Sequence, residues 1–246
     1  MSIHLEYAPT TKFYKLFDVR CIEAIGELIR GIGINESLDV AAQKPRVLDV
    51  GCGRGELLQE LSNLGFECYG LDVDENCVEL SKKYGHVVQC SAEEVDVKFS
   101  KNFFNVVILS HVLEHMDNPM EIAKKISYVS SKYIVIAVPN LAEPNLLYGT
   151  AVRKFLRSFG REFNPSSINK GHKFGWDPSH LKTFLEYSCG LKILKWKVDR
   201  VVIVPAIIPT LLEYVRLRDF LEVRLLPKFF PFWSHSLMGL YHNIVN

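Results

Sequence analysis

The chain lacks the features that would assign it to several common protein classes. It has six cysteines among 246 residues, none in a Cys-x-x-Cys pair, and a net charge of only +1. The scattered cysteines, most at apolar positions, indicate buried free thiols in a reducing cytoplasm. The near-neutral charge gives no overall attraction to nucleic acid or to an anionic lipid surface.

Targeting and membrane segments are also missing from the pattern. The stretch from residue 1 to residue 7 has no apolar signal region and no cleavage site, and no run approaches 18 uninterrupted apolar residues. We therefore expect a cytoplasmic protein without a membrane span. A composition of 48% hydrophobic residues is enough for a full core, which predicts a single domain over residues 1–246.

The most informative pattern lies between residues 46 and 57. An apolar stretch contains Asp49 near its end, and Gly51, Gly53 and Gly55 precede an amphipathic segment. This order predicts a strand, a tight turn and a helix whose N-terminus faces a ligand. The dinucleotide fingerprint requires Gly or Ala where this chain has Glu56, and it needs no acid at the strand end. A ligand that carries an ammonium and a sulfonium does need such an acid.

This run resembles motif I of the class I S-adenosylmethionine (SAM) dependent methyltransferases. Residues 66–72 form a second apolar stretch that ends in Asp72, which can accept both hydroxyls of a ribose. Residues 91–93 fit the adenine-contacting loop of the family. Residues 110–115 resemble its small-molecule branch, which includes the ubiquinone-biosynthesis O-methyltransferases. The likeness is good over residues 44–140, returns at 171–194 and is weak at 234–243.

The resemblance implies that SAM is the cofactor. The residues expected to hold it are Asp49, Gly51, Cys52, Gly53, Gly55, Asp72, Val73, Ala92, Glu93 and Ser110.

The alternation of strand and helix patterns predicts an α/β fold with a parallel sheet and helices on both faces. The expected strands are 46–50, 66–72, 86–90, 105–109, 133–138, 191–204 and 236–242, and the expected helices include 12–31, 74–84, 118–130 and 177–187. The resemblance implies a Rossmann-like seven-stranded sheet of order 3-2-1-4-5-7-6 with strand 7 antiparallel, and a cap insertion.

Two segments do not fit the regular alternation and are expected to be substrate-side insertions. Residues 140–176 are too long for a tight connection and are interpreted as a cover over the acceptor, with a loose surface insertion as the alternative. Residues 205–233 belong to an apolar stretch that begins at 201. Two interpretations of this stretch stay open: a helical hairpin packed on the core or on a second subunit, and an apolar surface for a lipid substrate or a membrane interface.

An oxygen acceptor must lose its proton, and three histidines are candidates for the base: His115, His111 and His172. His111 and His115 follow strand four at a spacing of four, with Glu114 beside them. The quinone O-methyltransferases have an E-x-x-E-H segment here that is associated with a divalent metal. In this chain a histidine replaces the first carboxylate, so we expect no metal. A contact with substrate or cofactor, a structural role and metal ligation stay open for these histidines.

On the substrate side, Trp176 lies in a His-aromatic segment like one that closes over the acceptor in relatives, and Tyr14 is expected near the cofactor entrance. The sequence thus predicts an enzyme that methylates a small-molecule, lipid or sugar-linked acceptor at oxygen, with a rate that falls below a pKa near 6.5. The alternatives are an NAD-dependent oxidoreductase and a catalytically inactive SAM-binding regulator or partner protein. We expect no nucleic-acid partner, while a homodimer and a peripheral membrane contact stay open.

Overall fold

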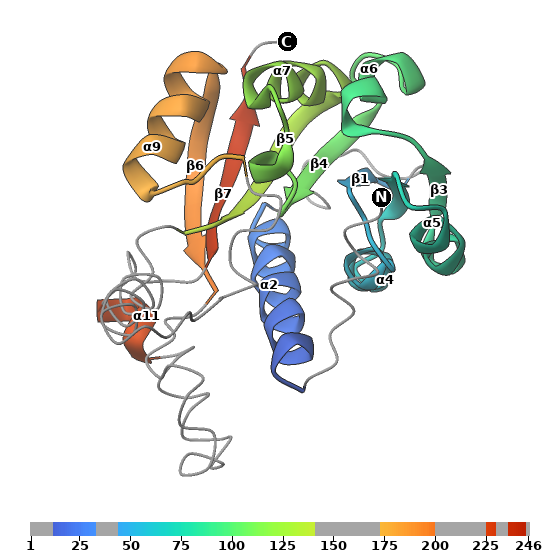
Figure 1. The fold of residues 1–246 in the computed structure, drawn as a ribbon, viewed down its shortest axis with the longest axis horizontal. Helices are drawn as coiled ribbons and strands as arrows, with labels where there is room; N and C mark the ends of the chain where they lie inside the picture. Colours follow the sequence, from blue (N-terminus) through green and yellow to red (C-terminus); the bar gives the residue numbers. More distant parts are fainter. Residues whose placement is uncertain (1–11, 33–43, 141–172, 200–224, 230–235, 245–246) are drawn as a thin grey trace, which may run out of the picture.

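The structure is a computed structural model of the chain, and it describes residues 12–32, 44–140, 173–199, 225–229 and 236–244 (Figure 1). The predicted insertions at 140–176 and 205–233 lie largely outside the described residues, as does His172. No helix in the described part is both long enough and apolar enough to cross a membrane.

A single mixed sheet organises the described residues. Its strands are β1 (Arg46–Val50), β2 (Glu67–Asp72), β3 (His86–Gln89), β4 (Phe104–Ser110), β5 (Ser130–Pro139), β6 (Leu191–Val198) and β7 (Ser236–Asn243). The order is β3-β2-β1-β4-β5-β7-β6, and β7 is antiparallel to both of its neighbours. The predicted sheet order and the antiparallel seventh strand are therefore confirmed.

Helices cover both faces of this sheet. The helices of the described residues are α2 (Lys12–Arg30), α4 (Glu56–Asn63), α5 (Glu75–Ser81), α6 (Val95–Lys98), α7 (Pro119–Val129), α9 (Pro178–Thr183) and α11 (Leu226–Phe229), with short turns η1 (Lys82–Tyr84), η2 (Ala92–Glu94), η3 (Leu113–His115) and η4 (Phe184–Ser188). Of these, α11 lies away from the sheet (Figure 1). Buried residues of α2, α4 and α5 form one apolar cluster with the sheet, and those of α6, α7 and α9 form the other (Figure 1). Alternate residues of the central strands, such as β1 and β4, belong to the two clusters, because successive side chains point to opposite faces.

Local sequence signals set the helix starts. The side chains of Asp74, Asn118 and Asp177 accept backbone N–H groups at the beginnings of α5, α7 and α9. Pro119 and Pro178 follow two of these caps at the first helical position, where the missing N–H costs nothing.

The sixth strand is shorter than predicted, since β6 ends at Val198 rather than at 204. Its partner β7 limits it: Val198 pairs with Leu237, and the preceding residue, Ser236, is the first of β7. The backbone N–H of Ser236 is donated to the side chain of Asp199 at 2.9 Å, so the carboxylate takes up the bond that a longer strand would have used. Residues 200–204 lie outside the described part.

Candidate functional site

The glycine turn between β1 and α4 adopts a backbone that ordinary residues avoid. The φ angles of Gly51 and Gly53 are 73° and 54°. A Cβ atom on Gly51 would lie 2.7 Å from Cγ2 of Val112, whereas one on Gly53 would meet nothing within 4 Å. The turn is thus packed against the segment after β4 on one side and is open at Gly53, where a ligand can approach the backbone.

Asp49 lies beneath this turn as a buried acid. Its side chain is 2% exposed, and its Oδ1 has no hydrogen-bond partner among the described residues. Burial raises the pKa of Asp49 from 3.8 to about 7, and the nearby carboxylates of Asp72 and Glu56 add to the effect. An unpartnered, desolvated acid of this kind is suited to a positively charged ligand, which would favour its ionised form.

Asp72, at the end of β2, connects the second strand to the glycine turn. Its Oδ2 accepts the N–H of Gly53 and its Oδ1 accepts the N–H of Asp74, both at 2.9 Å. Each carboxylate oxygen can still accept a second hydrogen bond, which leaves capacity for a diol such as a ribose. The next residue, Val73, is 64% exposed and offers an apolar surface beside that position.

Unlike the open position at Gly53, the side chain of Cys52 is buried within the protein. Its thiol is buried and lies 3.7 Å from the hydroxyl of Ser81, its N–H is donated to Leu71, and its carbonyl accepts the N–H of Gly55. A Cβ on Gly70 would come within 2.9 Å of its sulfur. Cys52 therefore contributes to the shape of the turn through packing, and its role in cofactor contact stays a prediction.

The predicted adenine loop forms η2 and is capped by its own side chains. Ser91 accepts the N–H of Glu93 at 3.1 Å, and Glu94 accepts the N–H of Ser91 in return. Within it Ala92 is buried and Glu93 is exposed. The loop follows β3, whose neighbour β2 carries Asp72, so both lie at the same edge of the sheet.

His111 lies where β4 leaves the sheet, and it has a strained backbone. Its φ is 56°, in the left-handed region that non-glycine residues rarely adopt, and its N–H is donated to Ala137 at 2.9 Å. Its Nε2 is 3.8 Å from Sγ of Cys21 on α2 and 3.4 Å from Oγ of Ser236 on β7. Ser110, the predicted cofactor residue before it, contacts the same thiol at 3.6 Å.

Glu114 lies between the two histidines of this segment. Its Oε1 is 3.5 Å from Nδ1 of His111 and 3.9 Å from Nε2 of His115. The side chain is 1% exposed, and neither oxygen has a hydrogen bond within the described residues. Burial alone would lower the pKa of His111, but its contacts with Cys21 and Glu114 hold that pKa well above 6.5. The pKa of Glu114 is correspondingly lowered by His111, against the effect of burial.

The segment before α9 packs directly onto this turn. The backbone N–H groups of Lys173 and Phe174 are donated to the carbonyl of Glu114 at 2.7 and 3.1 Å. Trp176 is buried, and its backbone forms an isolated parallel β-bridge with Asn140. The ring of Phe174 stacks on the Trp176 ring and is 39% exposed. The structure thus brings the segment that carries the predicted substrate residue Trp176 next to the strand-four segment.

Sequence reasoning did not find all residues of this cluster. Cys21 and Ser236 are 90 and 125 residues away from His111 along the chain, and only the packing of α2 and β7 brings them to it. The side chain of Tyr14, at the start of α2, lies outside the described side chains.

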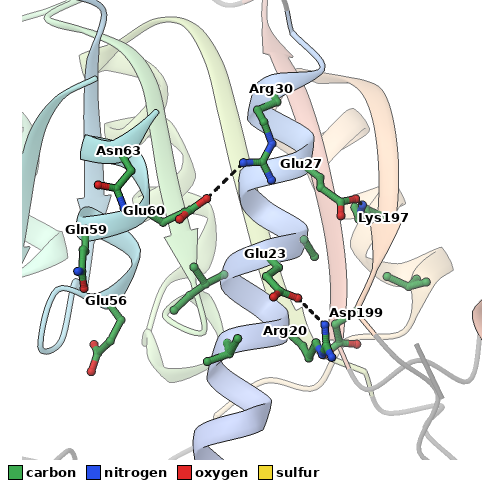
Figure 2. Close-up of a pocket in the computed structure, with 14 residues that line it drawn as sticks. Arg20, Glu23, Glu27, Arg30, Glu56, Gln59, Glu60, Asn63, Lys197 and Asp199 are labelled. Carbon is green, nitrogen blue, oxygen red and sulfur yellow. Dashed lines mark hydrogen bonds and ion pairs between the residues drawn. The ribbon is translucent and has the colours of Figure 1, made fainter. Parts of the chain in front are cut away.

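A separate groove of about 910 Å³ runs between α2, α4 and the end of β6. Figure 2 shows that charged side chains line it, with Arg30 paired to Glu60 and Arg20 paired to Glu23. None of the lining residues is a predicted site residue, and most of its charged side chains pair with one another, including Lys197 with Glu27. We therefore place the candidate site at the glycine turn and the strand-four segment instead.

Comparison with known proteins agrees with this site. A family model described as a methyltransferase domain matches residues 33–165, more than half of the chain. The chain belongs to this family. Its recognition as a class I SAM-dependent methyltransferase is confirmed, and the cofactor of the family is SAM. The oxidoreductase alternative is set aside.

The methyltransferase has distant relatives of known structure. It is 22% identical to a SAM-dependent methyltransferase from Archaeoglobus fulgidus, with a TM-score of 0.54 over 94% of this chain and 100% of that one. A magnesium protoporphyrin IX methyltransferase from Synechocystis with bound S-adenosylhomocysteine has a TM-score of 0.60 at 14% identity, over 96% and 89% of the two chains. At these identities the likeness shows a shared fold.

The chain is also similar to a curated O-methyltransferase. The ubiquinone biosynthesis O-methyltransferase of Rickettsia conorii is 23% identical over 171 residues, which cover 67% of this chain and 53% of the relative. The methyltransferase therefore spans about half the length of this curated relative.

The residues present fit the family cofactor. The orphaned Oδ1 of buried Asp49 offers a counter-charge, Asp72 has free acceptor capacity, and the open side of Gly53 leaves room for close approach. Bound SAM supplies a methyl group already activated by a sulfonium, so the protein has mainly to align donor and acceptor.

Proposed function

We propose that this methyltransferase transfers the methyl group of SAM to an oxygen of a small-molecule, lipid or sugar-linked acceptor, with His111 as the base. The observation that carries the proposal is the contact between the glycine turn and the strand-four segment. Val112 would be 2.7 Å from a Cβ on Gly51, so His111, the residue before Val112, is held beside the predicted cofactor site.

The chemistry of the cluster supports a base at this place. An oxygen acceptor with a high pKa needs a proton acceptor in reach, and an imidazole beside a buried carboxylate is a stronger base than an isolated imidazole. Because the pKa of His111 is raised well above 6.5, its neutral form is present only at higher pH. The rate is therefore expected to fall as the pH drops below this raised pKa. The fall on the acid side of the pH–rate profile should then begin above the 6.5 expected from the sequence.

The small-molecule acceptor class is supported by the relatives, whose name places them in ubiquinone biosynthesis. The same proposal includes a cytoplasmic location and no nucleic-acid partner. It also includes a homodimer and a peripheral membrane contact as possible associations. The cover formed by residues 140–176 and 205–233 is also a proposal, supported by the docking of Lys173 and Phe174 on the carbonyl of Glu114.

The test is transfer of label from methyl-labelled SAM to a panel of phenols, hydroxylated lipids and sugar nucleotides, each paired with an amine of similar shape. We expect labelled product from an oxygen acceptor, and a rate about 10²–10⁴-fold lower in His111→Ala with SAM affinity unchanged. His115→Ala, the same substitution at the other histidine of this segment, is the matched comparison, and its rate should fall less than that of His111→Ala. Label that reaches only amines would contradict the oxygen assignment, and equal activity of both variants would remove His111 as the base.

A second candidate is a SAM-binding partner protein without its own activity. Cys21 and Ser236 already contact Nε2 of His111, and such a filled position would suit a protein that needs no base. Tight binding of S-adenosylhomocysteine together with no transfer to any acceptor in the panel would favour this candidate.

A further inference from the structure

We propose that Glu114 is a positioning residue that holds the Nδ1–H of His111, and so makes Nε2 the nitrogen that takes the acceptor's proton. The role of Nε2 rests on the proposed function, whereas the pairing of Glu114 with His111 stands on geometry alone.

The first observation is the burial of an acid without hydrogen bonds. The side chain of Glu114 is only 1% exposed, and neither of its oxygens has a hydrogen-bond partner within normal geometry among the described residues. A buried carboxylate is unfavourable unless a cation or a donor compensates it. His111 is the nearer of the two imidazoles beside it, at 3.5 Å against 3.9 Å for His115. Lys173 contacts Glu114 through its backbone, while its Nζ is paired with Asp117.

The second observation is the orientation of the His111 ring. A carboxylate only accepts hydrogen bonds, so the nitrogen that faces it carries the proton, and the lone pair of the neutral ring is then on Nε2. Nε2 faces two weak donors, the thiol of Cys21 at 3.8 Å and the hydroxyl of Ser236 at 3.4 Å. Both contacts are long for hydrogen bonds, and a better donor such as an acceptor hydroxyl can replace them.

The backbone fixes both members of the pair. His111 is held in a left-handed conformation by its bond to Ala137, and the carbonyl of Glu114 accepts two N–H groups from the segment before α9. A strained residue that is over-determined by its surroundings is typical of a functional site. The ring of His111 is therefore pre-positioned before an acceptor binds.

The proton and the charge balance in this scheme. With SAM bound, the acceptor oxygen would form its bond to the methyl group as the methyl–sulfur bond breaks, and the electron pair of that bond would stay on the sulfur of S-adenosylhomocysteine, which leaves. The acceptor's proton moves to Nε2, and the imidazolium that results is stabilised by the Glu114 carboxylate. Water then removes the proton and restores the neutral ring. The titratable groups in contact with His111 are Cys21 from α2 and Glu114 from η3. One contact further away, His115 faces Glu114, and Asp199 accepts the backbone N–H of Ser236.

The experiment is a pH titration of the full chain labelled with ¹⁵N-histidine, recorded by NMR with and without S-adenosylhomocysteine. We expect the neutral ring of His111 to carry its proton on Nδ1. In Glu114→Gln we expect the pKa of His111 to fall, because one of the contacts that raise it is lost, and the two tautomers to mix. The matched control is Glu121→Gln, the same substitution at an exposed glutamate of α7 that pairs with Lys125, and it should leave His111 unchanged.

Three results would overturn the proposal: a proton on Nε2 in the unaltered protein, an unchanged titration in Glu114→Gln, or metal ligation. The last would appear as a joint shift of the His111 and His115 signals on addition of Mn²⁺ or Zn²⁺, reversed by a chelator and lost in Glu114→Gln. If Glu114→Gln does not fold, the tautomer of the unaltered protein still decides the question. Failure of the proposed function is seen separately, as no transfer of label to oxygen while the titration gives the expected result.

Discussion

Asp49 is predicted to destabilise the free protein above neutral pH, and Asp49→Asn is predicted to remove that effect. The carboxyl group is buried and its pKa is raised from 3.8 to about 7, so the folded chain binds its proton more tightly than the unfolded chain does. Stability therefore falls as the pH rises from about 4 to about 7, where the folded protein must ionise a desolvated group.

The magnitude can be worked out from the two pKa values. A displacement from 3.8 to about 7 corresponds to about 4 kcal/mol, at about 1.4 kcal/mol for each pH unit. Asparagine has nearly the same shape and carries no charge. Asp49→Asn should therefore be more stable than the unaltered protein at pH 8, by up to about 4 kcal/mol, and the advantage should shrink steadily towards pH 4.

Urea denaturation of both proteins at pH 5, 6.5 and 8 measures this difference, and comparing the two at each pH cancels the titration of all other groups. A variant that is less stable than the unaltered protein at pH 8 would refute the reasoning. So would a difference that is the same at pH 5 and pH 8, since it would show that Asp49 does not titrate in this range.

Cofactor binding should reverse the preference. If the Asp49 carboxylate faces the positive charge of SAM, binding at pH 6 should release close to one proton, and affinity should fall about tenfold for each pH unit below 7. Calorimetry in two buffers of different ionisation enthalpy measures the released proton. In Asp49→Asn the proton release should disappear and the affinity should be low at every pH.

Four further substitutions test the site and the sheet. Gly51→Ala should lose about 1–3 kcal/mol of stability and most of the SAM affinity, because its Cβ would meet Val112 at 2.7 Å. Gly53→Ala has open space around the new Cβ, so it should show only the smaller cost of backbone strain. Thermal melting and calorimetry measure stability and affinity for both variants. Asp72→Ala should weaken SAM binding by about 2–4 kcal/mol, measured by calorimetry, and an unchanged affinity would exclude it from the cofactor site. Asn243→Ala should cost about 2–3 kcal/mol in urea denaturation, because the side-chain amide is donated to the buried carbonyls of residues 127 and 130, and a neutral effect would show that other donors replace it.

The sequence was sufficient for the sheet because the strands are marked twice, by apolar runs and by the polar residues at their ends. β1 and β2 carry acids at or near their carboxyl ends, and α5 and α7 begin with capping residues that the local pattern reveals. Element limits were less certain where polar residues continue a strand. β5 starts at Ser130, three residues before the apolar run, because Ser130 pairs with Phe104 of β4. That pairing belongs to the sheet and leaves no mark in the local pattern.

The site was only partly predictable, for a related reason. The glycine turn and Asp72 are local signals, and the structure brings them together through the bond from Gly53 to Asp72. The environment of His111 is not local, since it depends on α2, β7 and the segment before α9. Spacing alone gave His111 and His115 equal weight. Their different distances to Glu114, and the left-handed backbone of His111, distinguish them only in three dimensions.

Two buried carboxylates, Asp49 and Glu114, therefore carry most of the functional argument. Neither is explained by the stability of the fold, because an apolar residue of similar size would avoid the cost of desolvating a charge. Asp49 has an oxygen without a partner among the described residues beside the open glycine turn, and Glu114 has imidazoles beside it. Each becomes favourable when a positive charge is next to it: SAM for Asp49, and the imidazolium of His111 for Glu114. We propose that the first charge is that of the bound cofactor. Above the raised pKa of His111, the second charge forms as the acceptor's proton moves to Nε2, so one acid would favour binding of the methyl donor and the other the transfer itself.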